Sequence, residues 1–454
     1  MSPQVPGSAA IAGKARWVLD RALTFGARNP QSARRIALLI LAGSSLFWLL
    51  FFDSVAFGAR AFRAANTGYE QIAQSLAQQG SYSAHGHPTA FRPPLYPLFL
   101  AAHIAVFGEA WPTMARASQA LMAFGCGYLL AALSERITGS ASARMLAAVF
   151  CAGFVPLQIE AAAKRETILF VLLSLGCVAL ISAERRSAGR MAALGALVGA
   201  AFLTRPTGLL LGIVAIATLL APLRAERPAM RIRNAALVAG CALVVLSPWY
   251  VRNYLVWGVV TLSTSSTGSW VNVLKGNNPG FWVHFPWIDS DKYDLILFPA
   301  HGIHGYMELD QGSGLKRAAL DYIAAEPGRA LIRSLAKAVV FVSPISVPLG
   351  SGEIVSGGGG LEIRGFRFRN PAVMLVYAAY TAAFYWSIVR AFRGLASYGT
   401  MARTVYAFVG GFALLLVALH VIACPETRYR LPLDALLVLV LSLEVHRALS
   451  SRRV

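Results

Sequence analysis

Residues 166–223 read ETILFVLLSLGCVALISAERRSAGRMAALGALVGAAFLTRPTGLLLGIVAIATLLAPL. This stretch holds three apolar runs, at about 166–183, 189–204 and 206–223. Each approaches the roughly 20 residues that a helix needs to cross a bilayer core of about 30 Å. The first break contains Arg185, Arg186 and Arg190, and the second is Arg205-Pro206. Because basic loops stay in the cytoplasm, we expect the first break inside and Arg205 outside.

The same pattern repeats along the chain of 454 residues, which is 56% hydrophobic and 14% charged. Its mean hydropathy is +0.57, and a soluble domain carries about 25% charged residues. The sequence therefore predicts an all-α polytopic membrane protein. The spans are expected at about 36–57, 112–133, 142–159, 166–183, 189–204, 206–223, 233–249, 371–391, 402–423 and 431–448.

The basic loops also order the spans across the membrane. All the basic loops can lie in the cytoplasm only if the apolar stretches 94–107 and 330–348 do not cross the membrane. We interpret both as surface or re-entrant helices on the outer face, which gives ten crossings; versions with up to thirteen spans stay open. Both termini are then cytoplasmic, and the working surface faces away from the cytoplasm.

Four segments follow from this topology. They are a basic cytoplasmic segment (1–35), a transmembrane module with its first periplasmic loop at 58–111 (36–249), a periplasmic segment (250–370) and C-terminal transmembrane helices (371–454). The net charge of +20 would suggest nucleic acid in a soluble protein. Here basic cytoplasmic loops explain it, so the expected partner is the lipid bilayer and not nucleic acid.

Unusual polar residues gather on the outer face of this topology. They are one acid and five arginines, on a face with four proline-stiffened helix entries: Arg92, Glu166, Arg205, Arg252, Arg428 and Arg430. Arginine forms bidentate hydrogen bonds to phosphate, and a carboxylate can activate a nucleophile as a general base. Each residue also has a plainer interpretation, such as a lipid-headgroup anchor, a turn or a local ion pair. Together they indicate a site for a phosphorylated lipid.

The order of motifs resembles the bacterial polyprenyl-phosphate-sugar-dependent glycosyltransferases of the GT-C superfamily, relatives of protein O-mannosyltransferases and of the lipid A aminoarabinose transferase. The resemblance covers residues 36–448. The matching motifs are Tyr69-x-x-Ile72-Ala73, Gly80-x-Tyr82-Ser83, Arg92-Pro93-Pro94-Leu95-Tyr96-Pro97, Phe107-Gly108, Pro156 leading to Glu166, Thr204-Arg205-Pro206, Pro248-Trp249-x-x-Arg252-Asn253, Gly276-Asn277-Asn278-Pro279 and Arg428-Tyr429-Arg430-Leu431-Pro432.

The resemblance implies an inverting sugar transfer on the periplasmic face of the bacterial inner membrane, from a polyprenyl-phosphate donor to a glycan, lipid or protein acceptor of the cell envelope. Arg92 matches a basic residue near the donor phosphate, and Glu166 matches an acid of the family. We expect Arg205, Arg252, Arg428 and Arg430 to assist at the phosphate. Polar residues of the motifs are expected to position substrate: Asn66, Tyr69, Tyr96, Asn277, Asn278 and Tyr429.

One departure from the family concerns catalysis. Relatives carry an acid four residues before the matched tyrosine, commonly followed by a second, and this chain has Ala65 and Asn66 there. Neither side chain can accept a proton. The candidate catalytic acids are therefore Glu166, Asp53 and Glu70.

Three functions stay open on the sequence: a glycosyltransferase, a non-catalytic relative or partner subunit, and a flippase or transporter. Ionisable residues at the ends of the spans favour the first over the third. No metal-binding motif is present, so we expect no obligatory cofactor, with a divalent cation as the alternative.

Overall fold

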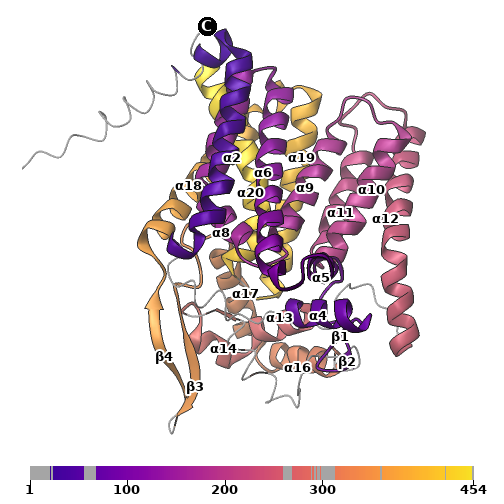
Figure 1. The fold of residues 1–454 in the computed structure, drawn as a ribbon, viewed down its shortest axis with the longest axis vertical. Coiled ribbons are helices and arrows are strands. Elements are labelled where there is room, and N and C mark those ends of the chain that lie inside the picture. The colour runs from indigo at the N-terminus through magenta and orange to yellow at the C-terminus, as the bar shows by residue number, and fades with distance from the viewer. Residues whose placement is uncertain are drawn as a thin grey trace, which may run out of the picture.

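The computed structural model describes residues 21, 24–55, 68–258, 268–287, 289–290, 293, 297, 312–357, 360–424 and 426–451. Each of the ten expected spans contains a helix or a pair of helices. They are α2 (Pro30–Val55), α6 (Trp111–Thr138), α7 (Ala141–Gly153) with α8 (Val155–Ala162), α9 (Thr167–Ile181), α10 (Ala188–Thr204), α11 (Gly208–Leu220), α12 (Pro228–Trp257), α18 (Pro371–Gly394), α19 (Thr400–Ile422) and α20 (Leu431–Ser450). Figure 1 shows the long helices standing side by side as a bundle.

The lengths of these helices differ more than the apolar runs suggest. Five described helical segments are long and apolar enough to cross a membrane, and a sixth is counted if α7 and α8 form one span. Those two helices meet at 61°, so the expected span 142–159 is not one straight helix. Pro156, in the first turn of α8, explains the break, because proline has no N–H to donate to the preceding turn and its ring clashes with the carbonyl four residues earlier. Helices α9 to α11, at 1.5 Å per residue, are about 20–26 Å long.

Shorter helices lie across one end of the bundle, which we call the site end (Figure 1). They are α4 (Tyr69–Gln79), α5 (Leu95–Phe107), α13 (Gly268–Asn277), α14 (Pro279–His284), α16 (Gly312–Ala325) and α17 (Pro327–Val342). Helices α5 and α17 cover the two stretches expected at the surface. The apolar side chains of Leu331, Ile332 and Leu335 on α17 are exposed, as a helix on lipid requires.

Two short antiparallel strand pairs interrupt the all-helical pattern. They are β1 (Ser83–Ala84) with β2 (His87–Pro88), and β3 (Gly350–Gly357) with β4 (Gly360–Phe368). Gly357 at the end of β3 pairs with Gly360 at the start of β4, and the two residues between them lie outside the described residues.

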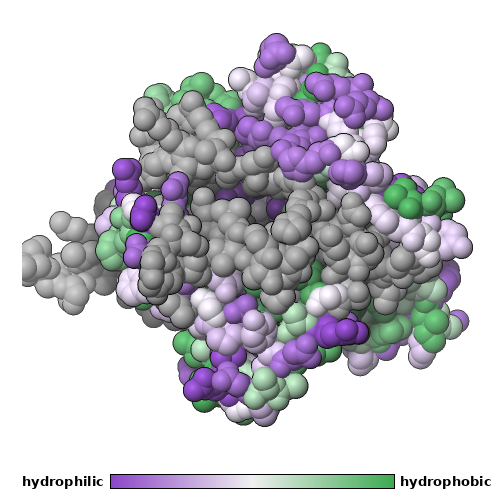
Figure 2. Space-filling model, turned by 90° about the horizontal axis from the view of Figure 1, so that it is seen from below, coloured by the Kyte–Doolittle hydropathy of each residue, from purple (hydrophilic) through white to green (hydrophobic). Residues whose placement is uncertain are grey.

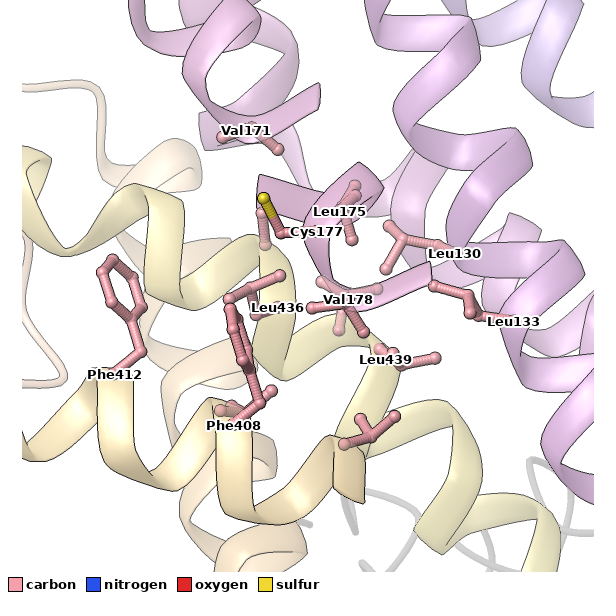
Figure 3. Packing of buried hydrophobic residues seen from close by; sticks show 14 of the residues in the cluster. Leu130, Leu133, Val171, Leu175, Cys177, Val178, Phe408, Phe412, Leu436 and Leu439 are labelled. Atoms are coloured by element: carbon pink, nitrogen blue, oxygen red, sulfur yellow. The ribbon is translucent and has the colours of Figure 1, made fainter. Parts of the chain in front are cut away.

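The core lies where α6, α9, α19 and α20 meet. Figure 3 shows side chains from all four helices packed together: Leu130, Leu133, Val171, Leu175, Cys177, Val178, Phe408, Phe412, Leu436 and Leu439. Every residue of α20 from Leu431 to Glu444 is buried, which is typical of a central helix surrounded by others. A second apolar cluster, including Val271, Leu274, Phe281 and Leu315, holds α13, α14 and α16 at the site end.

Candidate functional site

Glu166 lies at the site end, immediately before α9, and pairs with the residue that ends α10. Its Oε1 is 3.3 Å from Nε of Arg205, and the two side chains are 14% and 12% exposed. Tyr69 is buried, and the Glu166 carboxylate lies close enough to its hydroxyl to raise the pKa of that group. The guanidinium of Arg92 lies 4.8 Å from the centre of the Tyr69 ring. Thus three motifs far apart in the sequence meet around one carboxylate.

The electrostatics of Glu166 follow from these neighbours. Burial raises the pKa of its carboxyl, but the positive charges of Arg205 and then Arg92 outweigh burial, so the net pKa is lowered. Burial and the charge of Glu166 raise the pKa of Tyr69. Glu166 is therefore ionised at neutral pH, and Tyr69 is a neutral hydrogen-bond donor.

The Arg92 backbone is held by a chain of contacts from α12. The Tyr82 hydroxyl donates to the carbonyl oxygens of Arg92 (2.9 Å) and Pro93 (3.3 Å). Arg252 donates to the carbonyl oxygens of Tyr82 and Thr89, each at 2.9 Å. Arg252 therefore fixes the loop that carries Arg92, and its N–H groups point into protein.

The approach to Glu166 is held in a similar way. Gln119 of α6 donates to the carbonyl oxygens of Ala161 (3.0 Å) and Ala163 (2.6 Å). It accepts a hydrogen bond from Tyr96, at 2.9 Å. Tyr96 is fully buried, so its place is in the scaffold that positions residues 161–163. Gln119 was missed because a glutamine within an apolar span gives no motif.

Arg428 and Tyr429 lie at the start of the last span. The Arg428 guanidinium pairs with Glu426 (2.6 Å) and Asp289 (3.3 Å) and donates to the Tyr429 hydroxyl (3.1 Å). The side chain of Glu426 has no exposed surface. Both acids were missed by sequence reasoning: Glu426 stands two residues before a quoted motif, but Asp289 gives no signal.

Arg369 is a further residue that the sequence did not single out. It lies between β4 and α18 and donates to the Ser346 hydroxyl at 2.6 Å. Burial lowers the pKa of Arg369. The negative charges of Glu426, Asp289 and, more weakly, Glu160 raise it and offset part of that effect. Glu160 in turn accepts a hydrogen bond from the hydroxyl of Thr167, the residue after Glu166, at 3.0 Å, which relates the surroundings of Arg369 to the start of α9.

Arg430 lies differently from the other arginines. All five of its N–H groups can be assigned to protein acceptors: Nε to Asp434 (2.9 Å), one amino group to the carbonyl oxygens of Phe341 (2.7 Å) and Ser343 (3.2 Å), the other to Tyr377 (2.6 Å) and Thr381 (3.0 Å). The residue is buried. In this structure no donor is left for a phosphate, and Arg430 joins α17, α18 and α20.

Asn277 and Asn278 also lie in the scaffold. Asn277 donates to the carbonyl oxygens of Val273 (2.7 Å) and Ile422 (3.2 Å). Asn278 caps α14, accepting from the Gly280 amide at 2.8 Å. A Cβ on Gly276 would collide with the Ala423 carbonyl oxygen. This motif therefore seats α13 against the end of α19, and its amides serve packing.

Glu70 is placed differently from Glu166: its carboxylate pairs with Lys164 at 2.6 Å. Asp53 lies near the end of α2, but its side chain is outside the described residues, as are Ala65 and Asn66. Of the two candidate acids whose side chains the structure describes, Glu166 is the one that interacts with two of the expected arginines.

Figure 2 views the site end directly and shows hydrophilic residues gathered over parts of it, with hydrophobic residues toward the rim. Hydrophobic patches at the edge of this view suit a protein whose sides contact lipid. The Glu166 and Arg428 clusters lie at this end, at the starts of α9 and α20.

Comparisons with known proteins bear on the fold. The model of the dolichyl-phosphate-mannose-protein mannosyltransferase family matches residues 91–251, a range that includes Arg92, Glu166 and Arg205. No curated protein matches the sequence.

Solved structures of membrane glycosyltransferases resemble the whole chain. AglB, an oligosaccharyltransferase from Archaeoglobus fulgidus in complex with an inhibitory peptide and a dolichol-phosphate, is 14% identical with a TM-score of 0.50, over 92% of this chain and 52% of that one. The Archaeoglobus fulgidus oligosaccharyltransferase tethered with an acceptor peptide is also 14% identical. Its TM-score is 0.51, and the match covers 93% of this chain and 50% of that one. ArnT from Cupriavidus metallidurans bound to undecaprenyl phosphate is 16% identical over 91% of this chain and 78% of that one, but its TM-score of 0.39 is too low to support an inference.

This chain spans about half the length of the oligosaccharyltransferase chains that it matches. The similarity covers nearly all of this chain, and the family model covers the segment with the Glu166 cluster. The chain therefore has the GT-C fold, and the resemblance to the GT-C superfamily that its ordered motifs predict is confirmed.

Proposed function

We propose that this protein is a membrane glycosyltransferase that moves a sugar from a polyprenyl-phosphate donor to a cell-envelope acceptor on the periplasmic face of the inner membrane, with inversion. The observation that carries the proposal is the Glu166 carboxylate, held 3.3 Å from Arg205 with Arg92 close by. A phosphate ester needs cations at its leaving oxygen, and a nucleophile needs a base. This cluster supplies both.

The proposed reaction follows from the charges. The acceptor hydroxyl or amine donates a hydrogen bond to Glu166 and attacks the anomeric carbon as the bond to the phosphate oxygen breaks. Arg92 and Arg205 stabilise the charge on the departing polyprenyl phosphate. The acceptor proton passes to Glu166. A carboxylate of lowered pKa is a weak base, but the oxocarbenium-like transition state of sugar transfer requires little proton removal until late.

Arg252, Tyr82 and Tyr96 act in this scheme as positioning residues. Their hydrogen bonds end on the backbone or side chains that carry Arg92 and lead to Glu166. Arg428 and Tyr429 border the same region and are proposed to contact the donor from the other side, with Arg369 beside them. Arg430, Asn277 and Asn278 are assigned to the scaffold.

The test separates binding from chemistry. Purified protein in nanodiscs is mixed with an undecaprenyl-phosphate sugar and membranes as the acceptor source, and free undecaprenyl phosphate is measured. Glu166→Gln should lower its release at least about 100-fold, the scale of a lost general base, while native mass spectrometry finds the donor still bound. Glu135→Gln is the matched control, since Glu135 pairs with Arg34 and Arg144 at the other end of the bundle. Wild-type protein that neither binds nor consumes any such donor would contradict the proposal.

A second candidate function is that of a non-catalytic partner subunit. The observation favouring it is the pair Ala65 and Asn66 where relatives carry acids. A protein of this kind would show no turnover in the same assay, and Ala65→Asp would not create any. It would instead co-purify in fixed ratio with an active transferase.

A further inference from the structure

An open cavity of about 710 Å³ lies at the end of the bundle opposite the site. Its walls come from the ends of α6, α18 and α20 and from the segment before α19; the polar side chains that matter are Arg390, Arg393, Tyr398, Tyr406, Glu444 and Arg447. Along α20, Glu444 is about 21 Å from Arg430 at 1.5 Å per residue. The cavity is thus separate from the proposed transferase site.

One buried carboxylate organises the wall of this cavity. Glu444 accepts hydrogen bonds from the hydroxyls of Tyr398 (2.8 Å) and Tyr406 (2.7 Å). It also lies 3.7 Å from Arg390 and 3.9 Å from Arg447. The Arg447 guanidinium stacks on the Tyr398 ring, 3.4 Å from its centre. These contacts hold two arginines in fixed orientations at the cavity wall.

The cavity carries more positive charge than its own residues neutralise. Three arginines face one carboxylate, and His446 also lines the wall. Among the described residues, Arg393 forms no hydrogen bond and no ion pair. Helix dipoles explain part of this pattern, because helix C-termini favour cations. Helix dipoles do not, however, explain why these residues line a cavity. The volume of this cavity is within the range of small-molecule sites, about 300–1,000 Å³.

The guanidinium groups that line the cavity indicate which anion it suits. Planar guanidinium groups suit the tetrahedral oxygens of phosphate.

We propose that this cavity is a second binding site, one that takes a phosphate group. The phosphate belongs either to a lipid headgroup or to a small water-soluble phosphate ester. Hydroxyls of Ser397, Ser450 and Ser451 line the same wall and suit the polar part of such a ligand. The proposal does not depend on the transferase activity.

The experiment uses the full chain in phosphatidylcholine nanodiscs. Two probes are titrated and followed by native mass spectrometry: phosphatidic acid, and glycerol 3-phosphate. Arg393→Gln should weaken binding about five- to tenfold, the effect of one charge-assisted contact. Glu444→Gln should tighten it, because the competing negative charge is removed while an oxygen remains for both tyrosines. Arg185→Gln is the matched control: Arg185 is exposed in the loop after α9 and does not line the cavity.

The two probes distinguish the sources of the phosphate. Binding of phosphatidic acid alone identifies a lipid site, and binding of both probes identifies a site for the phosphate ester itself. Arg92→Gln, at the other end of the bundle, should change neither. Binding of neither probe, or binding that Arg393→Gln and Arg185→Gln affect equally, would overturn the proposal.

Discussion

At the scale of single residues, the ion pair between Glu166 and Arg205 sets the ionisation of the site. The ordinary pKa of the carboxyl is 4.5, and the net effect of its surroundings is to lower it. A reaction that requires ionised Glu166 therefore keeps its rate as the pH falls to about 4.5 and loses it only below. The same sign holds for stability: the contribution of this group is complete above 4.5 and is lost as the pH falls through the lower, folded-state pKa.

Arg205→Gln should shift the acid limb of the pH profile of kcat/KM to higher pH. Burial, which raises the pKa of Glu166, stays in the variant, while the largest opposing charge is removed. The measurement is the pH profile of donor consumption for both proteins. Arg34→Gln, which removes an exposed arginine from Glu135 instead, should leave the profile unchanged. If the acid limb of the Arg205→Gln profile lies at the same pH as in the wild type, a group other than Glu166 determines that limb.

Arg430 illustrates how an arginine in a motif can belong to the scaffold. Arg430→Met should lower the free energy of unfolding by about 3–5 kcal/mol, because it leaves Asp434 buried without its partner. Adding Asp434→Leu should recover much of that loss. Denaturant unfolding of the purified variants in micelles measures both. Arg329→Met, at an exposed pair with Glu326, should cost at most about 1 kcal/mol, and equal losses for the two arginines would argue against a scaffold role for Arg430.

At the scale of elements, the loop between α4 and α5 connects α12 to the site. Its conformation depends on Tyr82, whose hydroxyl donates to the Arg92 and Pro93 carbonyls, and on Arg252, which holds the Tyr82 carbonyl. A long arginine side chain has many rotamers, so anchoring its backbone limits the volume that the guanidinium can sample. The element thereby pre-organises the proposed phosphate contact.

Tyr82→Phe tests this connection. It should cost about 1 kcal/mol of stability for the lost hydrogen bonds and also weaken donor binding, since Arg92 is held less firmly. Tyr380→Phe is matched chemically: the Tyr380 hydroxyl donates to the Phe150 carbonyl at 2.8 Å inside the bundle. That variant should lose similar stability and no affinity. If the two variants bind donor equally well, the loop does not position Arg92.

The break between α7 and α8 is a second example at this scale. The apolar run continues through it, so composition alone predicts one span. Because α8 turns away by 61°, its end brings Ala161 and Ala163 to Gln119, and Glu160 to within 3.0 Å of the Thr167 hydroxyl. The bend thus places the start of α9, and with it Glu166, at the site end.

At the scale of the whole molecule, the proposed sidedness is directly testable. We predict that the loop holding His87 faces the periplasm and that the loop holding Ser187 faces the cytoplasm. In intact cells, a membrane-impermeant maleimide should label His87→Cys and should reach Ser187→Cys only after lysis. Both positions are exposed or partly exposed, and the native cysteines are buried or lie within apolar helices. The reverse labelling would place the candidate site in the cytoplasm.

The sequence by itself determined the helical membrane class and the set of apolar segments. The reason is that transfer of a segment into lipid depends mainly on its own composition, which is a local property. The ordered motifs added the GT-C fold. They also pointed to Glu166, Arg92 and Arg205, since charged residues at the ends of spans stand out against an apolar background.

Only the tertiary structure decided which of those charges meet. The pairing of Glu166 with Arg205, the anchoring of Arg92 through Tyr82 and Arg252, and the five donated hydrogen bonds of Arg430 all join distant segments. Arg428 and Arg430 stand two residues apart in one motif, yet one borders the candidate site and the other is enclosed by three helices. The hydrophobicity of a segment depends on its own residues alone. Ion-pair partners instead depend on how the helices pack, which no single segment determines.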